Sequence, residues 1–343
     1  MNNGMSSRLV YTQDELLTDH DYAEQHVVLG QRLHGGHMAD GTYQPPRALV
    51  RERAFDAWEA ALVERGGAPF GASAQLLEGI KLPTPEQQLV MLRNDLPMSF
   101  WNSLTIVGKI EAKGRLLAEM TFPDLQTAIV DDISEMAIGH LNTGLLLAHG
   151  LDEGGQPDEG IGGHDSMWFA ARDLVFGPGA FPDVEPPENI GREDAGVRFV
   201  PEIEANIEST VSFLANLLII EFRAEIGFAD TQEVLRTGDV FADRRDNANL
   251  AAEIIERIRT DELIHVRSLN LYLGEMRSVD FHTTSGGTVS GAELIDRFWS
   301  GLVRWATVDQ PALSIKESRR MYQERISAHA EADRVLAEFD AAV

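Results

Sequence analysis

Four long stretches with helical periodicity occupy the middle of the chain, and they constrain its fold more than any other feature. Apolar residues recur in them at three- and four-residue intervals, which is the spacing of one face of an α-helix. The stretches run from about 98 to 120, 125 to 149, 201 to 227 and 247 to 276. The sequence shows no alternation of strands with helices and no Gly-rich phosphate-binding loop. We therefore predict an all-α fold in which these four helices pack together.

The lengths of the connections predict how the helices are joined. A short break at Phe122-Pro123-Asp124 separates the first two, whereas a Gly- and Pro-rich segment, 150–200, separates the second from the third and holds one short helical piece. Two antiparallel helix pairs with one long crossover form a known type of four-helix bundle. The predicted organisation is a helical extension over 1–96, a bundle over 97–280 and further helices over 281–343.

The N-terminal region contains two clear helix signals and one loop signal. Residues 48–67 have a helical pattern that ends at two glycines, and Thr84 followed by Pro85 is typical of a helix start. The segment 34–46 is rich in Gly and Pro, which predicts a loop. His34 and His37 are interpreted as polar residues of that loop, with metal binding as the weaker alternative.

Composition excludes several classes of function. The chain of 343 residues is 43% hydrophobic, as in soluble globular proteins, and it contains no cysteine. Disulfides, iron–sulfur clusters and thiolate zinc sites are therefore excluded. A net charge of −26 argues against nucleic acid or an anionic membrane as a partner. No signal-peptide core or membrane-length apolar run is present, so we expect a cytoplasmic protein.

The pair Glu262 and His265 lies on the apolar side of the last long helix. With 30 glutamates and 10 histidines in the chain, chance alone supplies about one Glu-x-x-His, so the position of the pair matters more than its existence. The helical face through this pair also holds Ala251, Ile255, Ile258, Leu269 and Tyr272. A carboxylate and an imidazole on a buried stripe need a partner or a metal ion.

Two further glutamates occupy comparable positions. Glu221 follows a long apolar run and shares its face with Ile207, Leu214, Leu217, Leu218 and Phe228. Glu111 shares a less apolar face with Phe100, Leu104 and Val107. We therefore expect three helices to direct carboxylates toward the centre of the bundle.

These residues resemble the pattern of the ferritin-like di-iron carboxylate superfamily, which includes ribonucleotide reductase small subunits and rubrerythrins. The pattern has an acidic residue on the first helix, Glu-x-x-His on the second, Glu on the third and Glu-x-x-His on the fourth. The resemblance implies metal ligands at Glu111, Glu221, Glu262 and His265, with Asp261 orienting a histidine from outside the ligand set.

The second helix departs from this pattern. His140 is present, but Ala137 stands where the glutamate belongs, and the nearest carboxylate is Glu135, with Asp132 as the alternative. Glu135 and His140 diverge by about 140° on a regular α-helix. A π-bulge near Gly139 would bring them together, and an unbroken helix would leave one metal position depleted.

Several other residues carry weaker predictions. Tyr272 lies two turns after His265 and is interpreted mainly as a core residue, with a redox role as the alternative. Glu225 is the substitute for Glu221 if the helical register is shifted by one turn. Glu324 and His329 are interpreted as surface residues.

The resemblance implies two iron ions, or manganese, and an oxidoreductase that activates O₂ or peroxide to oxidise a small organic substrate. Because cysteine is absent, electrons would come from a separate donor, and a homodimer is possible. Iron storage or detoxification is one alternative. A metal-free helical binding or scaffold protein with a buried Glu/His network is another.

Overall fold

The computed structural model describes residues 8–79, 83–188, 190–192 and 196–342. Over these residues the fold is mostly helical, as the sequence predicts. The α-helices are α1 (Gln13–Leu16), α2 (Ala48–Glu64), α3 (Pro85–Arg93), α4 (Met98–Gly114), α5 (Leu146–Gly154), α6 (His164–Phe176), α7 (Ala205–Arg236), α8 (Arg245–Arg277), α9 (Gly291–Arg304), α10 (Gln310–Ser327) and α11 (Ala332–Ala341).

The α2 and α3 helices begin where the sequence signals place them. The α2 helix covers most of the predicted 48–67 segment. At the start of α3, the Thr84 side chain accepts a hydrogen bond from the Gln87 backbone, and the Gln87 side chain accepts one from the Thr84 backbone. This reciprocal pairing satisfies two backbone donors that a helix start otherwise leaves free.

Two small antiparallel sheets interrupt the predicted all-α fold. The first joins β1 (Glu24–Val28), β2 (Gln31–His37) and β3 (Tyr43–Gln44), and the second joins β4 (Asp280–His282) and β5 (Thr288–Ser290). Leu29 and Gly30 both have positive φ values, 51° and 79°, and form the two-residue turn between β1 and β2.

The predicted loop over 34–46 is therefore wrong in its first part. His34 and His37 belong to β2, and the segment closes with the short strand β3. Glycine content suggested a loop, but Gly35 and Gly36 lie against the rings of Tyr43 and Tyr22, where a side chain would collide. Here glycine allows close packing of a strand instead of ending it.

The second predicted long helix, over 125–149, is also wrong. This segment contains a 3₁₀ turn η3 (Leu125–Thr127), non-helical residues 128–136, a 3₁₀ turn η4 (Ala137–His140) and a π-helical turn η5 (Leu141–Leu145) before α5. Within η5, Gly144 has φ 111°, which an L-residue with a side chain rarely adopts. Irregularity was predicted here, but the π turn follows His140 and does not lie between Glu135 and His140.

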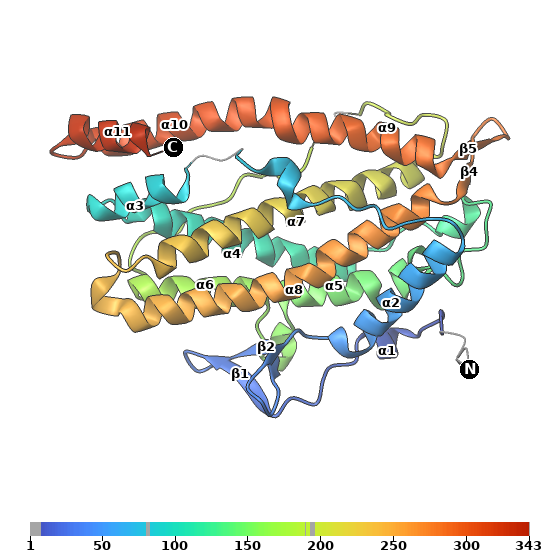
Figure 1. The fold of residues 1–343 in the computed structure, drawn as a ribbon, viewed down its shortest axis with the longest axis horizontal. Coiled ribbons are helices and arrows are strands. Elements are labelled where there is room, and N and C mark those ends of the chain that lie inside the picture. Colours follow the sequence, from blue (N-terminus) through green and yellow to red (C-terminus); the bar gives the residue numbers. More distant parts are fainter. Residues whose placement is uncertain (1–7, 80–82, 189, 193–195, 343) are drawn as a thin grey trace.

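The long helices pack side by side in the middle of the molecule (Figure 1). The α7 helix packs on α8, α4 packs on α6, and α6 also packs on α8. The α5 and α6 helices follow one another along one row. The short helical piece predicted within the crossover is α6, and it packs against two of the long helices, α4 and α8.

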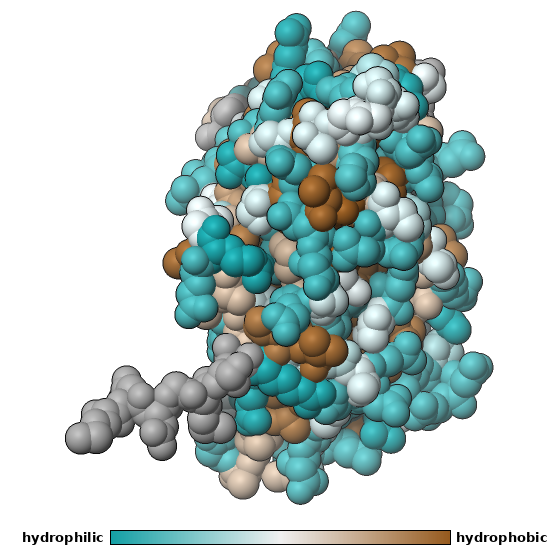
Figure 2. Space-filling model, turned by 90° about the vertical axis from the view of Figure 1, so that its right-hand side faces the viewer, coloured by the Kyte–Doolittle hydropathy of each residue, from teal (hydrophilic) through white to brown (hydrophobic). Residues whose placement is uncertain are grey.

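The terminal regions lie on opposite sides of these helices. The α9, α10 and α11 helices run along one side, and the small sheet β1–β2 with α1 lies on the other (Figure 1). The end of the molecule drawn in Figure 2 is mostly hydrophilic, with its apolar residues in separate small groups. None of the helices in the described ranges has the length and apolar character needed to cross a lipid bilayer.

Candidate metal centre

Seven buried side chains from five helices converge between the long helices. Two groups can be distinguished, and each offers ligand atoms that all lie within 4.8 Å of one another. The first group is His149, Glu153, Glu221 and His265, and the second is Glu111, Glu153, His164 and Glu262. Because Glu153 belongs to both, the two groups form one continuous cluster.

The first group has His149 and His265 at its centre. His149 Nε2 lies 3.1 Å from a Glu221 oxygen and 3.5 Å from a Glu153 oxygen. His265 Nδ1 lies 3.3 Å from the same Glu153 oxygen and 2.7 Å from Glu262. The two imidazole rings stack with centroids 3.8 Å apart, so both rings face the same small space.

The second group is centred on His164. Its Nδ1 atom lies 3.1 Å from Glu262, 3.5 Å from Glu153 and 3.6 Å from Glu111. The Glu153 oxygen in this group is Oε2, whereas Oε1 belongs to the first group. One carboxylate therefore directs one oxygen to each group, which is the arrangement of a bridging ligand.

His265 and Glu262 form a hydrogen bond at 2.7 Å, and the other separations, 3.1–3.6 Å, also fit a set of metal ligands. Ligand atoms about 2.1 Å from a common ion are about 3 Å apart when they lie at right angles. His149 Nε2 and His164 Nδ1 are buried without a hydrogen-bond partner, although carboxylate oxygens lie 3.1–3.6 Å away. A buried nitrogen that no donor or acceptor satisfies is costly, and a cation between it and the carboxylates would satisfy it.

The charge balance leads to the same conclusion. The cluster and its immediate partners include six buried carboxylates, Glu111, Asp152, Glu153, Glu221, Asp261 and Glu262. Two buried arginines, Arg47 and Arg51, contact Asp152. If the imidazoles are neutral, four negative charges remain, and two divalent cations would neutralise them. Imidazole and carboxylate together suit iron, manganese or zinc, so the residues fit such a pair.

The protein alone balances this charge only by shifting protons. Burial and the charge of Glu262 raise the pKa of Glu221 to about 8, and burial with Glu153 raises the pKa of Glu111 well above its usual range. Burial also raises the pKa of Glu262, but the nearby His265 and His164 outweigh burial and lower this pKa to about 2. The carboxylates thus compete for the same positive charge, and metal ligands must give up such protons on binding.

A glycine hairpin places Glu153 and His164 at the same level. The α5 helix ends at Gly154 and α6 begins at His164, and Gln156 pairs with Ile161 between them. A side chain at Gly155 or Gly163 would collide with the backbone of the other at 2.3–2.4 Å. Only glycine permits this approach, so the sequence of the hairpin fixes the position of both ligands.

The same hairpin attaches the N-terminal sheet to the cluster. The His34 backbone N–H donates to Gly162 O at 2.9 Å, and the Gly162 N–H donates to Arg32 O at 3.0 Å. These bonds bring His34 on β2 beside His164, with ring centroids 5.0 Å apart. A strand that the sequence did not predict therefore contributes to the surroundings of the metal ligands.

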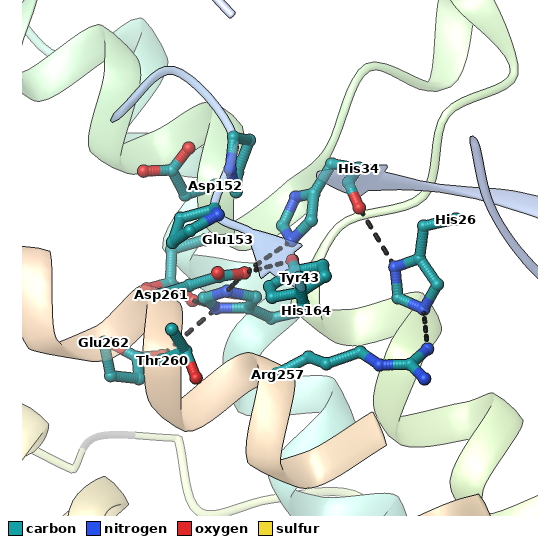
Figure 3. A network of polar contacts seen from close by, with 12 residues as sticks. His26, His34, Tyr43, Asp152, Glu153, His164, Arg257, Thr260, Asp261 and Glu262 are labelled. Atoms are coloured by element: carbon teal, nitrogen blue, oxygen red, sulfur yellow. Dashed lines mark hydrogen bonds and ion pairs between the residues drawn. The ribbon is translucent and has the colours of Figure 1, made fainter. Parts of the chain in front are cut away.

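Asp261 connects this strand to His164 (Figure 3). Its Oδ2 atom lies 3.2 Å from His164 Nε2, 3.1 Å from His34 Nε2 and 3.1 Å from the Tyr43 hydroxyl, which donates to it. This contact holds His164 with Nδ1 toward the glutamates. Carboxylates in this position fix the orientation of a ligating imidazole and raise its basicity. The predicted role of Asp261 is consistent with this placement.

The network continues outward through His26 (Figure 3). The His26 Nδ1 atom lies 3.1 Å from the backbone oxygen of His34, and Arg257 donates to His26 Nε2 at 2.8 Å. Burial and the nearby Arg257 lower the pKa of His26 to about 4. A neutral His26 is consistent with these bonds, because Nδ1 then donates and Nε2 accepts.

Asp152 orients His265 in the same way that Asp261 orients His164. The Asp152 Oδ2 atom lies 3.2 Å from His265 Nε2 and 2.7 Å from Arg51, and its Oδ1 atom forms an ion pair with Arg47 at 2.6 Å. Arg47 has φ 51°, an uncommon conformation for a residue with a side chain, directly before α2. The N-terminal region thereby supplies buried positive charge to one side of the cluster.

The structure brings together four of the predicted ligands but not the other two. Glu111, Glu221, Glu262 and His265 lie in the cluster. Glu135 and Asp132 are exposed on the non-helical segment before η4. His140 is buried elsewhere, where its ring lies 4.9 Å from that of Trp58 and accepts from the Tyr11 N–H. The helix that was expected to align them does not form, so the spacing argument no longer applies.

The residues with weaker predictions lie outside the cluster. Tyr272 is buried in the apolar core beside Ser268, as expected of a core residue. Glu225 is half-buried and lines a separate surface depression. Glu324 is exposed on α10 and pairs with Arg320, whereas His329 is half-buried.

Sequence reasoning missed His149, Glu153 and His164, together with Asp152. Two signals were available. His149 and Glu153 are four residues apart, which places them on one helical face. The dipeptide Asp152-Glu153 also repeats Asp261-Glu262, and in each the Asp contacts a histidine while the Glu joins the cluster. His164, at a helix start after a Gly-rich turn, has no comparable signal.

An apolar cavity reaches the cluster from the side of α4 and α7. It has a volume of about 260 Å³ and is lined by Glu111, Glu153 and Glu221 together with apolar side chains such as Ile110, Leu117 and Leu217. Concave apolar sites with a few polar groups are typical binding sites for small molecules. The carboxylates are therefore accessible to an organic ligand.

Comparison of the chain with protein-family models, curated proteins and solved structures gave no match. The site must therefore be interpreted from its own geometry.

Proposed function

We propose that the seven residues bind two metal ions, iron or alternatively manganese, and that the protein is an oxidoreductase that uses O₂ or peroxide to oxidise an organic substrate. The observation that carries this proposal is the pair of ligand groups that share Glu153, with buried imidazole nitrogens that lack hydrogen bonds. A bound metal pair of this type supplies redox chemistry that amino-acid side chains lack.

We also infer a ferritin-like architecture, with α4, α7 and α8 as three of its helices. In this interpretation the fourth position is divided between α5 and α6, and the long crossover is the segment between α6 and α7. The positions of Glu111 on α4, Glu221 on α7 and Glu262 with His265 on α8 support the inference. The Gly-rich break between α5 and α6 distinguishes this chain from the simple pattern.

The residues of the chain have separable tasks in this proposal. Four glutamates and three histidines bind the two metal ions. Asp152 orients His265 and Asp261 orients His164, each by a contact with the Nε2 atom of the imidazole. Apolar side chains of α4 and α7 surround the carboxylates on the cavity side, so an apolar ligand bound there would exclude water from them. The exclusion of water strengthens the electrostatic interactions inside the site.

Two rival functions make different demands on the site. Iron storage needs no organic binding site, so the apolar cavity at Glu111 and Glu221 favours a substrate. A metal-free polar network would be expected to satisfy its own donors and acceptors, whereas His149 Nε2 and His164 Nδ1 have no hydrogen-bond partner.

Anaerobic loading followed by exposure to oxygen tests the proposal. The purified protein should bind close to two Fe²⁺ per chain, and addition of O₂ should consume oxygen in proportion to the bound iron. Elemental analysis, an oxygen electrode and absorption spectroscopy provide the three measurements. Binding of many iron ions per chain would indicate storage, and no binding of iron, manganese or zinc would refute the metal centre.

A matched pair of variants makes the result specific. Glu153→Ala removes the carboxylate that both ligand groups share, whereas Glu135→Ala removes an exposed carboxylate outside the cluster. The first variant should lose metal and oxygen consumption, and the second should retain both. Equal behaviour of the two variants would contradict the assignment.

A further inference from the structure

A second cavity continues the first along α4 and α7. It has a volume of about 570 Å³ and shares Ile110, Glu111, Ile190, Ile220 and Ala224 with the 260 Å³ cavity. The two cavities therefore meet beside Glu111. We call the combined space the α4–α7 groove, and we call its parts the apolar limb (260 Å³) and the Arg223 limb (570 Å³).

The groove follows both helices. On α7 it extends from Phe213 in the apolar limb to Phe228 in the Arg223 limb, which is about 22.5 Å at 1.5 Å per residue. On α4 the order is reversed, because Gly114 lines the apolar limb and Val107 the Arg223 limb. The two helices are therefore antiparallel along the groove, and Glu111 lies between its ends.

The two limbs differ in chemistry. Leu116, Leu117, Met120, Phe213 and Leu217 line the apolar limb, with Lys113 as its cation. The other limb contains Arg223, Gln310 and Ser314, together with Glu317. The π-helical turn η8 (Trp305–Asp309) begins at this limb with Trp305, and such turns are frequent at functional sites. A ligand that spans both limbs must be polar at one end and apolar at the other.

The groups that Arg223 contacts are neutral, although Glu317 lines the same limb. The Arg223 guanidinium donates to Ile190 O at 3.1 Å and to Gln310 Oε1 at 3.5 Å, and it lies 5.0 Å from the ring centroid of Trp305. No carboxylate of the described residues forms an ion pair with it, unlike Lys109 on α4, which pairs with Glu185 at 2.6 Å. Burial lowers the pKa of Arg223, so an anion beside it would relieve the cost of its desolvation.

We propose that the groove binds a monocarboxylic acid with an extended apolar body, with its carboxylate on Arg223 and its body passing Glu111 into the apolar limb. The planar guanidinium matches the two oxygens of a carboxylate. The chain carries a net charge of −26, so the overall field opposes the binding of an anion, and a preference for one must come from the local charge of Arg223. Oxidation of this acid rests on the proposed function of the metal centre. Its binding depends only on the residues of the α4–α7 groove.

Three probes with the same tail and different heads test the charge preference. Decanoate, 1-decanol and decylammonium are titrated into the full-length protein by calorimetry. Decanoate should bind about 10- to 100-fold more tightly than decanol, because a hydrogen-bonded charge pair adds to the shared apolar contacts. Tighter binding of decylammonium, or equal binding of decanoate and decanol, would overturn the proposal.

Variants assign the preference to Arg223. Arg223→Ala should reduce the binding of decanoate to that of decanol, and Arg223→Lys should retain part of the difference. Arg236→Ala removes the same charge from the exposed end of α7, where Arg236 faces Glu256, and should change nothing. Ala224→Phe fills the junction of the two limbs and should weaken both ligands. A decanoate preference that survives Arg223→Ala in a folded protein would refute the assignment.

The orientation of the ligand can be measured separately. In protein loaded with Mn²⁺, paramagnetic broadening should be stronger for protons along the chain of decanoate than for the CH₂ group next to its carboxylate. The opposite order would mean that the carboxylate binds the metal ions directly, and it would refute the proposed orientation.

Metal-free protein separates this inference from the proposed function. Binding of decanoate through Arg223 should persist in the presence of a chelator. If the protein binds no metal but retains this preference, the proposed oxidation fails and the groove assignment stands. If metal binds and the preference is absent, the metal centre stands and this inference fails.

Discussion

The shared position of Glu153 predicts a graded loss of metal in three variants. Glu153 contributes to both ligand groups, whereas Glu111 belongs to one group and Glu221 to the other. Glu153→Ala should therefore bind no metal tightly, while Glu111→Ala and Glu221→Ala should each retain close to one ion per chain. Wild-type protein should bind two.

The magnitude of the stability change follows from linkage. A ligand at 100 times its dissociation constant stabilises a protein by about 2.7 kcal/mol, so two sites contribute about 5 kcal/mol. With an unfolding entropy of about 2.1 cal/mol/K per residue, this raises the melting temperature of a chain of this length by roughly 5–10 °C. Glu111→Ala and Glu221→Ala should each show about half of the shift, and Glu153→Ala should show none.

Scanning calorimetry with and without chelator, beside elemental analysis, provides the measurement. Without metal, the Glu153→Ala variant should be less stable than wild type, because His149, His164 and His265 hold the pKa of Glu153 well below its usual range and lose this partner. Glu135→Ala, which removes an exposed carboxylate, is the control and should behave as wild type. Two tightly bound ions in Glu153→Ala would refute the shared-ligand geometry. A melting temperature of the wild-type protein that is the same with and without chelator would refute it as well.

Asp261→Asn should lower metal affinity about 10- to 100-fold without loss of fold, measured by competition with a chromogenic chelator; unchanged affinity would contradict its role in orienting His164. Burial raises the pKa of Glu275 to about 7 from 4.5, so its protonated form favours the folded state at low pH, and this contribution is lost as pH rises through 7. Relative to Glu275→Gln, wild type should lose up to about 3 kcal/mol of unfolding free energy between pH 4.5 and 8, measured by urea titration, and a constant difference would refute this. Trp168→Ala, at a fully buried residue of the α6 core, should cost about 3–5 kcal/mol by the same method, and a loss below 1 kcal/mol would contradict that packing.

The helices that the sequence predicted well have a simple pattern. On α8, the face through Glu262 and His265 also carries Ala251, Ile258 and Leu269, and all five are buried. On α7, Glu221 follows an apolar run and is buried as expected. In both cases a long regular helix converts spacing along the chain into position in space, so the burial of a charged residue could be inferred.

The prediction of a second long helix was wrong for the opposite reason. The segment 125–149 has enough apolar residues to look helical, but its residues pack in 3₁₀, π and extended conformations. The Ala137 and Ile138 N–H groups donate to the Glu275 carboxylate on α8 at 3.1 and 2.9 Å, so tertiary contact determines this backbone. Periodicity cannot report a contact between distant segments, and Glu135 and His140, which were assigned from it, lie outside the cluster.

The Gly-rich hairpin shows a related limit. Five glycines between residues 154 and 163 predicted an open connection, but Gly155 and Gly163 are needed for close backbone contact. The same composition is therefore compatible with a flexible linker and with a tight structural element. Only the presence of ligands at both ends, Glu153 and His164, distinguishes the two.

The two Asp-Glu dipeptides link the halves of the cluster in a crossed arrangement. Asp152 on α5 orients His265 on α8, and Asp261 on α8 orients His164 on α6. Each Glu of these dipeptides also contacts the histidine that its neighbouring Asp orients: Glu153 contacts His265, and Glu262 contacts His164. Neither half can therefore be complete until α8 has packed against α5 and α6. The site forms together with the tertiary fold, so metal binding should stabilise the packing of these helices as a unit.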